Sequence, residues 1–258
     1  MQGQRTFVFL GTGTSVGVPM IGCDCPVCRS DNPRNHRYRS SGLIQTPRGN
    51  ILIDTGPELR LQLVRERVHL VNAVLYTHYH VDHLYGLDDL RLVAKYLNGP
   101  VPLYCADEVE QVIRRTFSYA FVDETAPIGF VPKLYFHRIA NDPFDVLGET
   151  VTPIPLLHSI FNVFGFRVGD MAYCTDVNEI PESSWPLLEG VRTLIIDALR
   201  YKSHPAHMGL NDALEVIERV NPEKAYLTHM SHEFDYETLS AQLPGGVEMA
   251  YDGLRFRF

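Results

Sequence analysis

The segment Thr77-His78-Tyr79-His80-Val81-Asp82-His83 places three histidines and one aspartate within six positions of the chain. It directly follows the apolar run 73–76, which is typical of a buried strand. Imidazole and carboxylate groups are the ligand set that suits zinc, manganese or iron. Because the His-x-His pair and the Asp-His pair can serve two neighbouring ions from one compact loop, this segment predicts a centre with two metal ions.

Short apolar runs bounded by Gly, Pro or Asp predict strands along the whole chain. They span residues 6–10, 50–54, 73–76, 101–105, 151–157, 171–175, 193–197 and 224–228. Helical patterns lie between them at residues 58–67, 88–97, 108–116, 211–220 and 236–243. The strands lack the steady β-α-β alternation of a doubly wound sheet, so we expect a fold of the α/β class in which two sheets form a sandwich with outer helices.

Further polar residues stand at the carboxyl ends of the predicted strands, where a rigid scaffold can present converging ligands. They are Asp54, His158, Asp176, Asp197 and His229. Together with the loop 78–83 they could complete a metal centre. Their shared position is more informative than any one of them.

The chain has 258 residues, enough for a sizeable core, and we expect a single domain over residues 1–258. Residues 118–143 are aromatic, contain proline and resist assignment, so they are a candidate insertion or lid over a pocket. The net charge of -8 disfavours general nucleic-acid binding, because that affinity comes from Lys and Arg. The net charge does not exclude a small anionic substrate, since divalent ions can make one pocket positive inside an acidic protein.

No run of about 18 apolar residues occurs, and residues 1–5 lead straight into a predicted strand, so we expect neither a membrane span nor a signal peptide. The expected location is the cytoplasm. Three of the five cysteines, Cys23, Cys25 and Cys28, crowd into one loop marked by Gly and Pro. In a reducing compartment this crowding indicates a metal site, and three thiolates leave a tetrahedral zinc one ligand short.

The H-x-H-x-D-H motif after an apolar strand resembles the signature of the metallo-β-lactamase superfamily, and the resemblance extends from Gly11 to His232. It implies a four-layer αββα sandwich, in which two mixed β-sheets are flanked by helices. It implies that Asp54 steadies the metal loop by contacting a ligand. It also implies two metal sites that share Asp176, one formed by His78, His80 and His158 and the other by Asp82, His83 and His229.

Within that superfamily, the cysteine cluster and the glycine-rich opening at residues 11–19 resemble the phosphoribosyl 1,2-cyclic phosphate phosphodiesterase family. The resemblance implies hydrolysis of a small phosphate ester with a five-membered cyclic phosphate, and it suggests a homodimer. It also implies two catalytic divalent ions, zinc or manganese, and one structural zinc whose fourth ligand is His232. In that family a histidine that binds no metal, here His207, takes part in catalysis.

The expected chemistry needs an activated water and a proton donor. Asp82 could bind one ion and also orient the water, while His207 is the candidate general acid for the leaving alkoxide. Asp197 could orient a ligand histidine from behind. Arg200 and Lys202 share a loop with His207 and could clamp a terminal phosphate.

Three alternatives use the same scaffold or a similar cysteine loop. A transfer-RNA 3′ processing nuclease opens with a similar glycine-rich strand, but the acidic charge and the lack of a Gly- and Lys-rich arm in the sequence count against it. A thioester or lactone hydrolase would use similar ligands. A metal-poor relative that binds a small metabolite would keep only the structural ion, and the complete ligand set counts against it.

Overall fold

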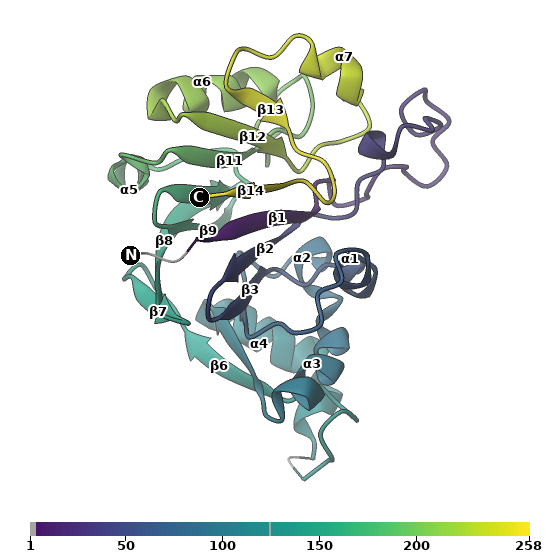
Figure 1. Cartoon of the computed structure of the whole chain (residues 1–258), viewed down its shortest axis with the longest axis vertical. Coiled ribbons are helices and arrows are strands. Elements are labelled where there is room, and N and C mark those ends of the chain that lie inside the picture. Colours follow the sequence, from purple (N-terminus) through teal and green to yellow (C-terminus); the bar gives the residue numbers. More distant parts are fainter. Residues whose placement is uncertain (1–3, 124) are drawn as a thin grey trace.

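The computed structural model describes residues 4–123 and 125–258, and its strands form two seven-stranded mixed sheets that pack face to face (Figure 1). The N-terminal sheet has the order β14 (Arg255–Arg257), β1 (Thr6–Gly11), β2 (Ser41–Thr46), β3 (Gly49–Ile53), β4 (Ala73–Leu75), β5 (Val101–Cys105) and β6 (Leu134–Arg138). The C-terminal sheet has the order β13 (Val247–Met249), β12 (Lys224–Thr228), β11 (Thr193–Asp197), β10 (Met171–Cys174), β9 (Phe161–Val168), β8 (Glu149–His158) and β7 (Phe144–Val146).

Alternate side chains of the strands point to opposite faces of each sheet and thereby build three apolar cores. In β1, Phe7 lies in the core between the two sheets, whereas its neighbour Val8 lies in the core outside the N-terminal sheet. In β11, Ile195 faces the central core and Leu194 faces the core outside the C-terminal sheet. Burying such a side chain fully contributes about 1.5–3 kcal/mol. The alternation of apolar side chains along each strand therefore stabilises the packing of layers on both faces of the sheet.

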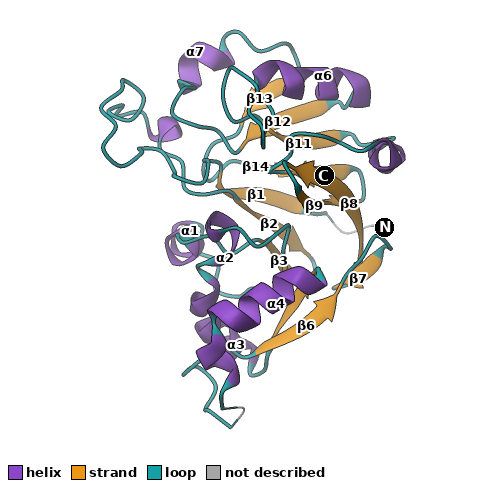
Figure 2. Ribbon diagram, turned by 180° about the vertical axis from the view of Figure 1, so that it is seen from behind, coloured by secondary structure: helices purple, strands orange, loops and turns teal. Residues whose placement is uncertain are grey.

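Helices cover the outer face of each sheet (Figure 2). The N-terminal sheet carries α1 (Leu59–Arg65), α2 (Val81–Leu84), α3 (Leu90–Leu97) and α4 (Asp107–Thr116), and the C-terminal sheet carries α5 (Trp185–Leu188), α6 (Leu210–Val220) and α7 (Tyr236–Ser240). Four 3-10 turns are η1 (Pro33–Asn35), η2 (Leu87–Asp89), η3 (Ser118–Phe121) and η4 (Glu182–Ser184). Ile113 of α4 and Ile217 of α6 complete the two outer cores. This arrangement confirms the four-layer αββα sandwich.

The sequence patterns do not anticipate six strands: β2, β6, β7, β9, β13 and β14. Three of them, β7, β13 and β14, have only three residues and are strands because they pair with a neighbour at a sheet edge. β2 opens with Ser41-Gly42, and β9 carries Gly165 in its middle, so both lack a continuous strand-like composition. The predicted helix 88–97 is divided between η2 and α3, and α7 ends at Ser240 rather than at residue 243.

Residues 118–143 include both η3 and the strand β6, so part of this segment is built into the edge of the N-terminal sheet. The hydroxyl of Tyr119 in η3 donates a hydrogen bond to Asp88 in η2. Residue 124 lies outside the described residues, and the lid role of the segment stays a prediction. Among the helices of the described residues, none is both long and apolar enough to cross a membrane.

Candidate metal centre

The polar residues at the strand ends meet at one edge of the sandwich. β3 and β4 run parallel, and so do β10, β11 and β12, so within each set the carboxyl ends lie together. Asp54 follows β3, Asp176 follows β10 and His229 follows β12, and all three adopt left-handed backbone conformations, with φ of 63°, 52° and 57°. Non-glycine residues in this region cost energy and cluster at functional sites. The fold therefore holds these side chains in place against a local backbone penalty.

Seven of the predicted ligands form two adjoining clusters. In each cluster the potential ligand atoms lie within 4.8 Å of one another, and the members are His78, His80 and His158 in one and Asp82, His83, Asp176 and His229 in the other. The Oδ1 atom of Asp176 is 3.1 Å from His83 Nε2 and 3.1 Å from His229 Nδ1. Its Oδ2 atom is 3.9 Å from His78 Nε2. Asp176 thus lies between the two clusters, with one oxygen toward each.

Protein contacts fix the orientation of three of the histidine rings. Asp54 accepts a hydrogen bond from His83 Nδ1 at 2.7 Å, and the backbone oxygen of Ala206 accepts one from His158 Nδ1 at 2.6 Å. The hydroxyl of Thr77 donates to Asp54, so its oxygen accepts from His78 Nδ1 at 3.0 Å. These contacts to Nδ1 leave Nε2 of each ring facing the centre, which is how histidine ligands are commonly held.

The buried ligand atoms are poised to bind cations. Within residues 4–123 and 125–258, His78 Nε2 and His229 Nε2 are buried side-chain atoms without a hydrogen-bond partner, whereas His83 Nε2 and Asp82 Oδ2 lie 3.2 Å apart. Burial holds the pKa of His78 well below its usual value, so this ring is neutral and can donate its lone pair. Buried polar atoms without partners are costly, and a metal ion would relieve that cost. The donor set of imidazole and carboxylate fits divalent ions.

Asp176 is ionised in spite of its burial. Desolvation would raise the pKa of its carboxyl group, but the nearby His229 and His83 outweigh this effect and hold the pKa well below its usual range. A similar balance lowers the pKa of Asp82: burial raises it, and His83 lowers it more. Both carboxylates are therefore negative at neutral pH, as cation ligands must be.

His207 lies beside the two clusters and is held by Asp197. Its Nδ1 is 2.7 Å from Asp197 Oδ2, and its ring centroid is 4.6 Å from that of His158 and 4.7 Å from that of His229. Burial lowers the pKa of His207, but the Asp197 carboxylate outweighs it and raises the pKa to about 9. The Asp197 contact leaves Nε2 available, so His207 can carry a proton to the edge of the centre.

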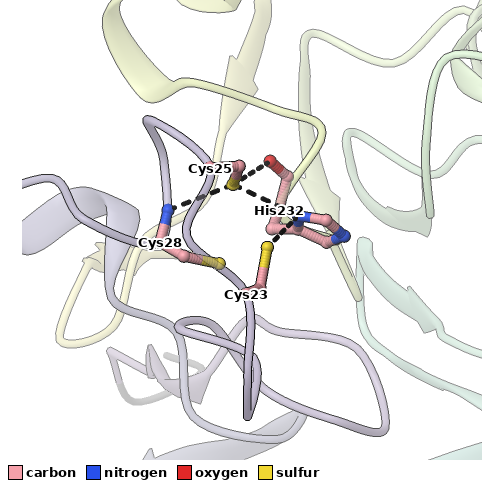
Figure 3. Close-up of side chains that lie close together, drawn as sticks. All are labelled: Cys23, Cys25, Cys28 and His232. Carbon is pink, nitrogen blue, oxygen red and sulfur yellow. Dashed lines mark hydrogen bonds between the residues drawn. The ribbon is translucent and has the colours of Figure 1, made fainter.

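The four residues predicted for a structural zinc also come together (Figure 3). Their ligand atoms lie within 4.8 Å of one another, and His232 Nδ1 is 3.4 Å from Cys23 Sγ and 3.3 Å from Cys25 Sγ. Tetrahedral zinc with usual bond lengths separates sulfur and nitrogen ligands by about 3.6 Å. The hydrogen bond with His232 lowers the pKa of Cys25 to about 6, which favours the thiolate. The set of Cys23, Cys25, Cys28 and His232 fits zinc.

Some residues that build the site carry no sequence signal. Arg37 is only 1% exposed, and its guanidinium donates to the backbone oxygens of Ser231, at 3.0 Å, and Phe234, at 2.7 Å. These two carbonyls flank His232, so Arg37 holds the segment that presents it. The hydroxyl of Ser40 lies 3.1 Å from His229 Nδ1. Neither contact follows from spacing, because both depend on which segments the fold brings together.

The two basic residues predicted to bind a substrate phosphate, Arg200 and Lys202, belong to neither ligand cluster. The guanidinium of Arg200 donates to the backbone oxygens of Lys202 and Ser203, at 3.2 and 3.3 Å, and is thereby folded onto its own loop. Lys202 is exposed. Their role toward a substrate stays a prediction.

The chain is similar to proteins of known family and known structure. Residues 49–230 match the family described as Beta-lactamase superfamily domain. The structure is similar to a crystal structure of a new diphosphatase from the PhnP family, with a TM-score of 0.94 and 38% identity over 100% of this chain and 98% of that chain. It is also similar in fold to zinc-bound PqqB from Methylobacterium extorquens, with a TM-score of 0.80 and 19% identity over 97% of this chain and 99% of that chain.

A relative of known sequence is the protein named Octanoyltransferase from Porphyromonas gingivalis. It is 36% identical over 251 residues, which cover 96% of this chain and 50% of that protein. The chain spans about half the length of the curated relatives that it matches.

Proposed function

Because the chain belongs to the metallo-β-lactamase superfamily, we propose that it is a phosphodiesterase that hydrolyses a small, five-membered cyclic phosphate ester. It is a metal-dependent hydrolase by its family and fold. The observation that carries the proposal is the pair of ligand clusters that meet at Asp176. The similarity to a diphosphatase of the PhnP family supports a small phosphate compound as the substrate. The cyclic ester is supported by the resemblance of the cysteine loop to the cyclic-phosphodiesterase family.

We assign one ion to His78, His80 and His158, and a second to Asp82, His83 and His229, with Asp176 shared. Two divalent ions bound there would activate water and neutralise charge on the phosphoryl oxygens. Asp54, Thr77 and the Ala206 carbonyl would keep the ligand rings in the required tautomer. Asp82 would bind an ion and accept a hydrogen bond from the attacking water.

The leaving oxygen needs a proton, and His207 is placed to supply it. Asp197 holds Nδ1 of the ring and favours its protonated form, so Nε2 can donate to the leaving alkoxide. The cysteine loop would bind a structural zinc through Cys23, Cys25, Cys28 and His232. This zinc would tie the N-terminal loop to the segment that carries His229, three residues before His232.

A substrate panel with metal-loaded protein tests the proposal. It compares a five-membered cyclic phosphate, a linear diester, a transfer-RNA precursor and a thioester. We expect the highest kcat/KM for the cyclic phosphate, and Asp176→Asn should lower it at least about 100-fold because one carboxylate serves both ions. His69→Ala, at an exposed histidine outside the ligand clusters, is the control and should leave kcat/KM unchanged.

The panel separates the competing functions. Preference for the thioester would contradict the reaction class, and equal rates on transfer-RNA precursors would contradict the small substrate.

A further inference from the structure

One side of the metal centre, next to His80, is apolar. Phe161 lies edge-on against the His80 ring, with centroids 5.3 Å apart, and Tyr79 lies edge-on against Phe161 at 6.1 Å. Ile160, the neighbour of Phe161, is 85% exposed. We call Tyr79, Ile160 and Phe161 the apolar ledge. It combines two partly buried aromatic rings with the exposed side chain of Ile160, and one of the rings contacts the proposed metal ligand His80.

The turn that carries Ile160 does not have the residues that two-residue hairpin turns usually favour. His158 pairs with Phe161 across β8 and β9, so Ser159 and Ile160 alone form the turn. Ser159 has φ of 57°, and two-residue turns favour glycine or asparagine in this conformation. Ile160 is exposed at the tip of the turn, so its side chain gains no stability from packing. Violations of local preference of this kind are expected at functional sites.

The ledge is also held in place. The side-chain oxygen of Asn178 accepts a hydrogen bond from Ser159 N, and Asn178 N donates to the backbone oxygen of Leu157 at 2.9 Å. Asn178 lies two residues after Asp176, so the turn is fastened to the loop of the shared ligand. A rigid apolar surface binds a group without the entropic cost of ordering itself.

We propose that the apolar ledge recognises the organic part of the substrate, a flat group with an apolar face such as a nucleobase, while the metal centre holds the phosphate. The inference rests on the proposed phosphodiesterase function and narrows its substrate class. Specific sites commonly combine an apolar wall with a few polar groups that fix orientation. Here the wall stands next to His80, so a substituent on a phosphate held by the ions would lie beside it.

The test compares two substrates that share a five-membered cyclic phosphate and differ in the base. These are adenosine 2′,3′-cyclic phosphate and methyl riboside 2,3-cyclic phosphate, in which a methoxy group replaces the base. The ratio of their kcat/KM values for the metal-loaded protein is expected to be about 10 or more in favour of adenosine, which corresponds to burial of part of an aromatic face. Ile160→Ser, a change at an exposed position, should lower this ratio at least about 5-fold, and Phe161→Leu should lower it in the same direction.

Leu92→Ser, at a half-exposed position in α3, is the control and should keep the ratio of the unmodified protein. A ratio near one in the unmodified protein, or a ratio that Ile160→Ser does not change, would contradict substrate recognition by the apolar ledge. The phosphodiesterase proposal would not be affected by either result. Hydrolysis of neither compound by protein with its ions bound would instead overturn the phosphodiesterase proposal itself, and the ledge with it.

Discussion

Asp54 sets the tautomer of a proposed ligand, although it would touch no ion itself. Its carboxylate accepts from the backbone N and the hydroxyl of Thr77, at 2.9 and 2.8 Å, and from His83 Nδ1 at 2.7 Å. A carboxylate can only accept here, so the proton of His83 must stay on Nδ1. The metal-facing nitrogen of His83 is therefore determined by a residue 29 positions earlier in the chain.

Asp54→Asn should weaken binding of the catalytic ions by about 10–100-fold, because an amide group can donate to Nδ1 and permit the wrong tautomer of His83. Metal content after dialysis against a chelator, measured by mass spectrometry, checks this. Asp142→Asn, at an exposed aspartate, is the control. Equal retention of all ions in Asp54→Asn and the unmodified protein would contradict the orienting role.

His207→Gln should lower kcat by about 10²–10⁴-fold on substrates with poor leaving groups, because it removes a general acid. The pKa of His207 is raised to about 9, so the acid is present below that pH and is lost as the pH rises through it. We therefore expect kcat/KM to fall above about pH 9 in the unmodified protein and this fall to vanish in His207→Gln. A pH profile with the same alkaline limb in both proteins would show that another group donates the proton.

The loop 12–37 and the segment 229–236 form one unit at the edge of the active centre. Thr14 N donates to the backbone oxygen of Met230 at 3.2 Å, and Met230 N donates to that of Thr12 at 2.9 Å. The guanidinium of Arg37 donates hydrogen bonds to the backbone oxygens of Ser231 and Phe234, before and after His232. The three cysteines of this loop and His232 of this segment also lie together (Figure 3). The zinc would thus fix the position of His229 through the intervening residues.

Cys25→Ser should release the structural zinc and lower the Tm by about 10 °C, because binding energy at such sites is folding energy. Calorimetry together with zinc analysis measures both effects. Cys105→Ala tests whether any cysteine substitution does the same, since this thiol is buried in β5 away from the cluster. An unchanged Tm with zinc lost would contradict a structural role for the ion.

The sequence predicted those parts of the molecule that depend on local pattern. The loop 78–83 could be assigned because four ligands lie within six positions, and the layered fold because apolar residues alternate along the long strands. Short edge strands such as β13, and the buried Arg37, could not be predicted, because each is defined by a partner distant in sequence. The left-handed backbone of Asp176 is likewise a property of the assembled loop.

The ligands of the centre come from both sheets of the sandwich. The segment after β4 carries His78, His80 and His83. In the C-terminal sheet, His158 ends β8, and Asp176 and His229 follow β10 and β12. Ions bound between them would cross-link the two sheets at this edge of the sandwich. Metal binding should therefore stabilise the whole fold and not only the loops.

Stripped protein should gain about 5–10 °C in Tm when divalent ions are added at about 100 times their Kd, since binding to the folded state alone adds about 2.7 kcal/mol. The gain is expected to shrink in His158→Ala, which removes a ligand contributed by the C-terminal sheet. A Tm that does not respond to ions would contradict cross-linking of the sheets.

The most direct test follows hydrolysis of a five-membered cyclic phosphate while metal-stripped protein, with its cysteine site already filled by zinc, is titrated with manganese. Activity is predicted to rise with added ion and to reach its plateau when two further ions are bound per chain. Full activity before any further ion binds, or a plateau with a single ion, would contradict a centre in which Asp176 joins two cations.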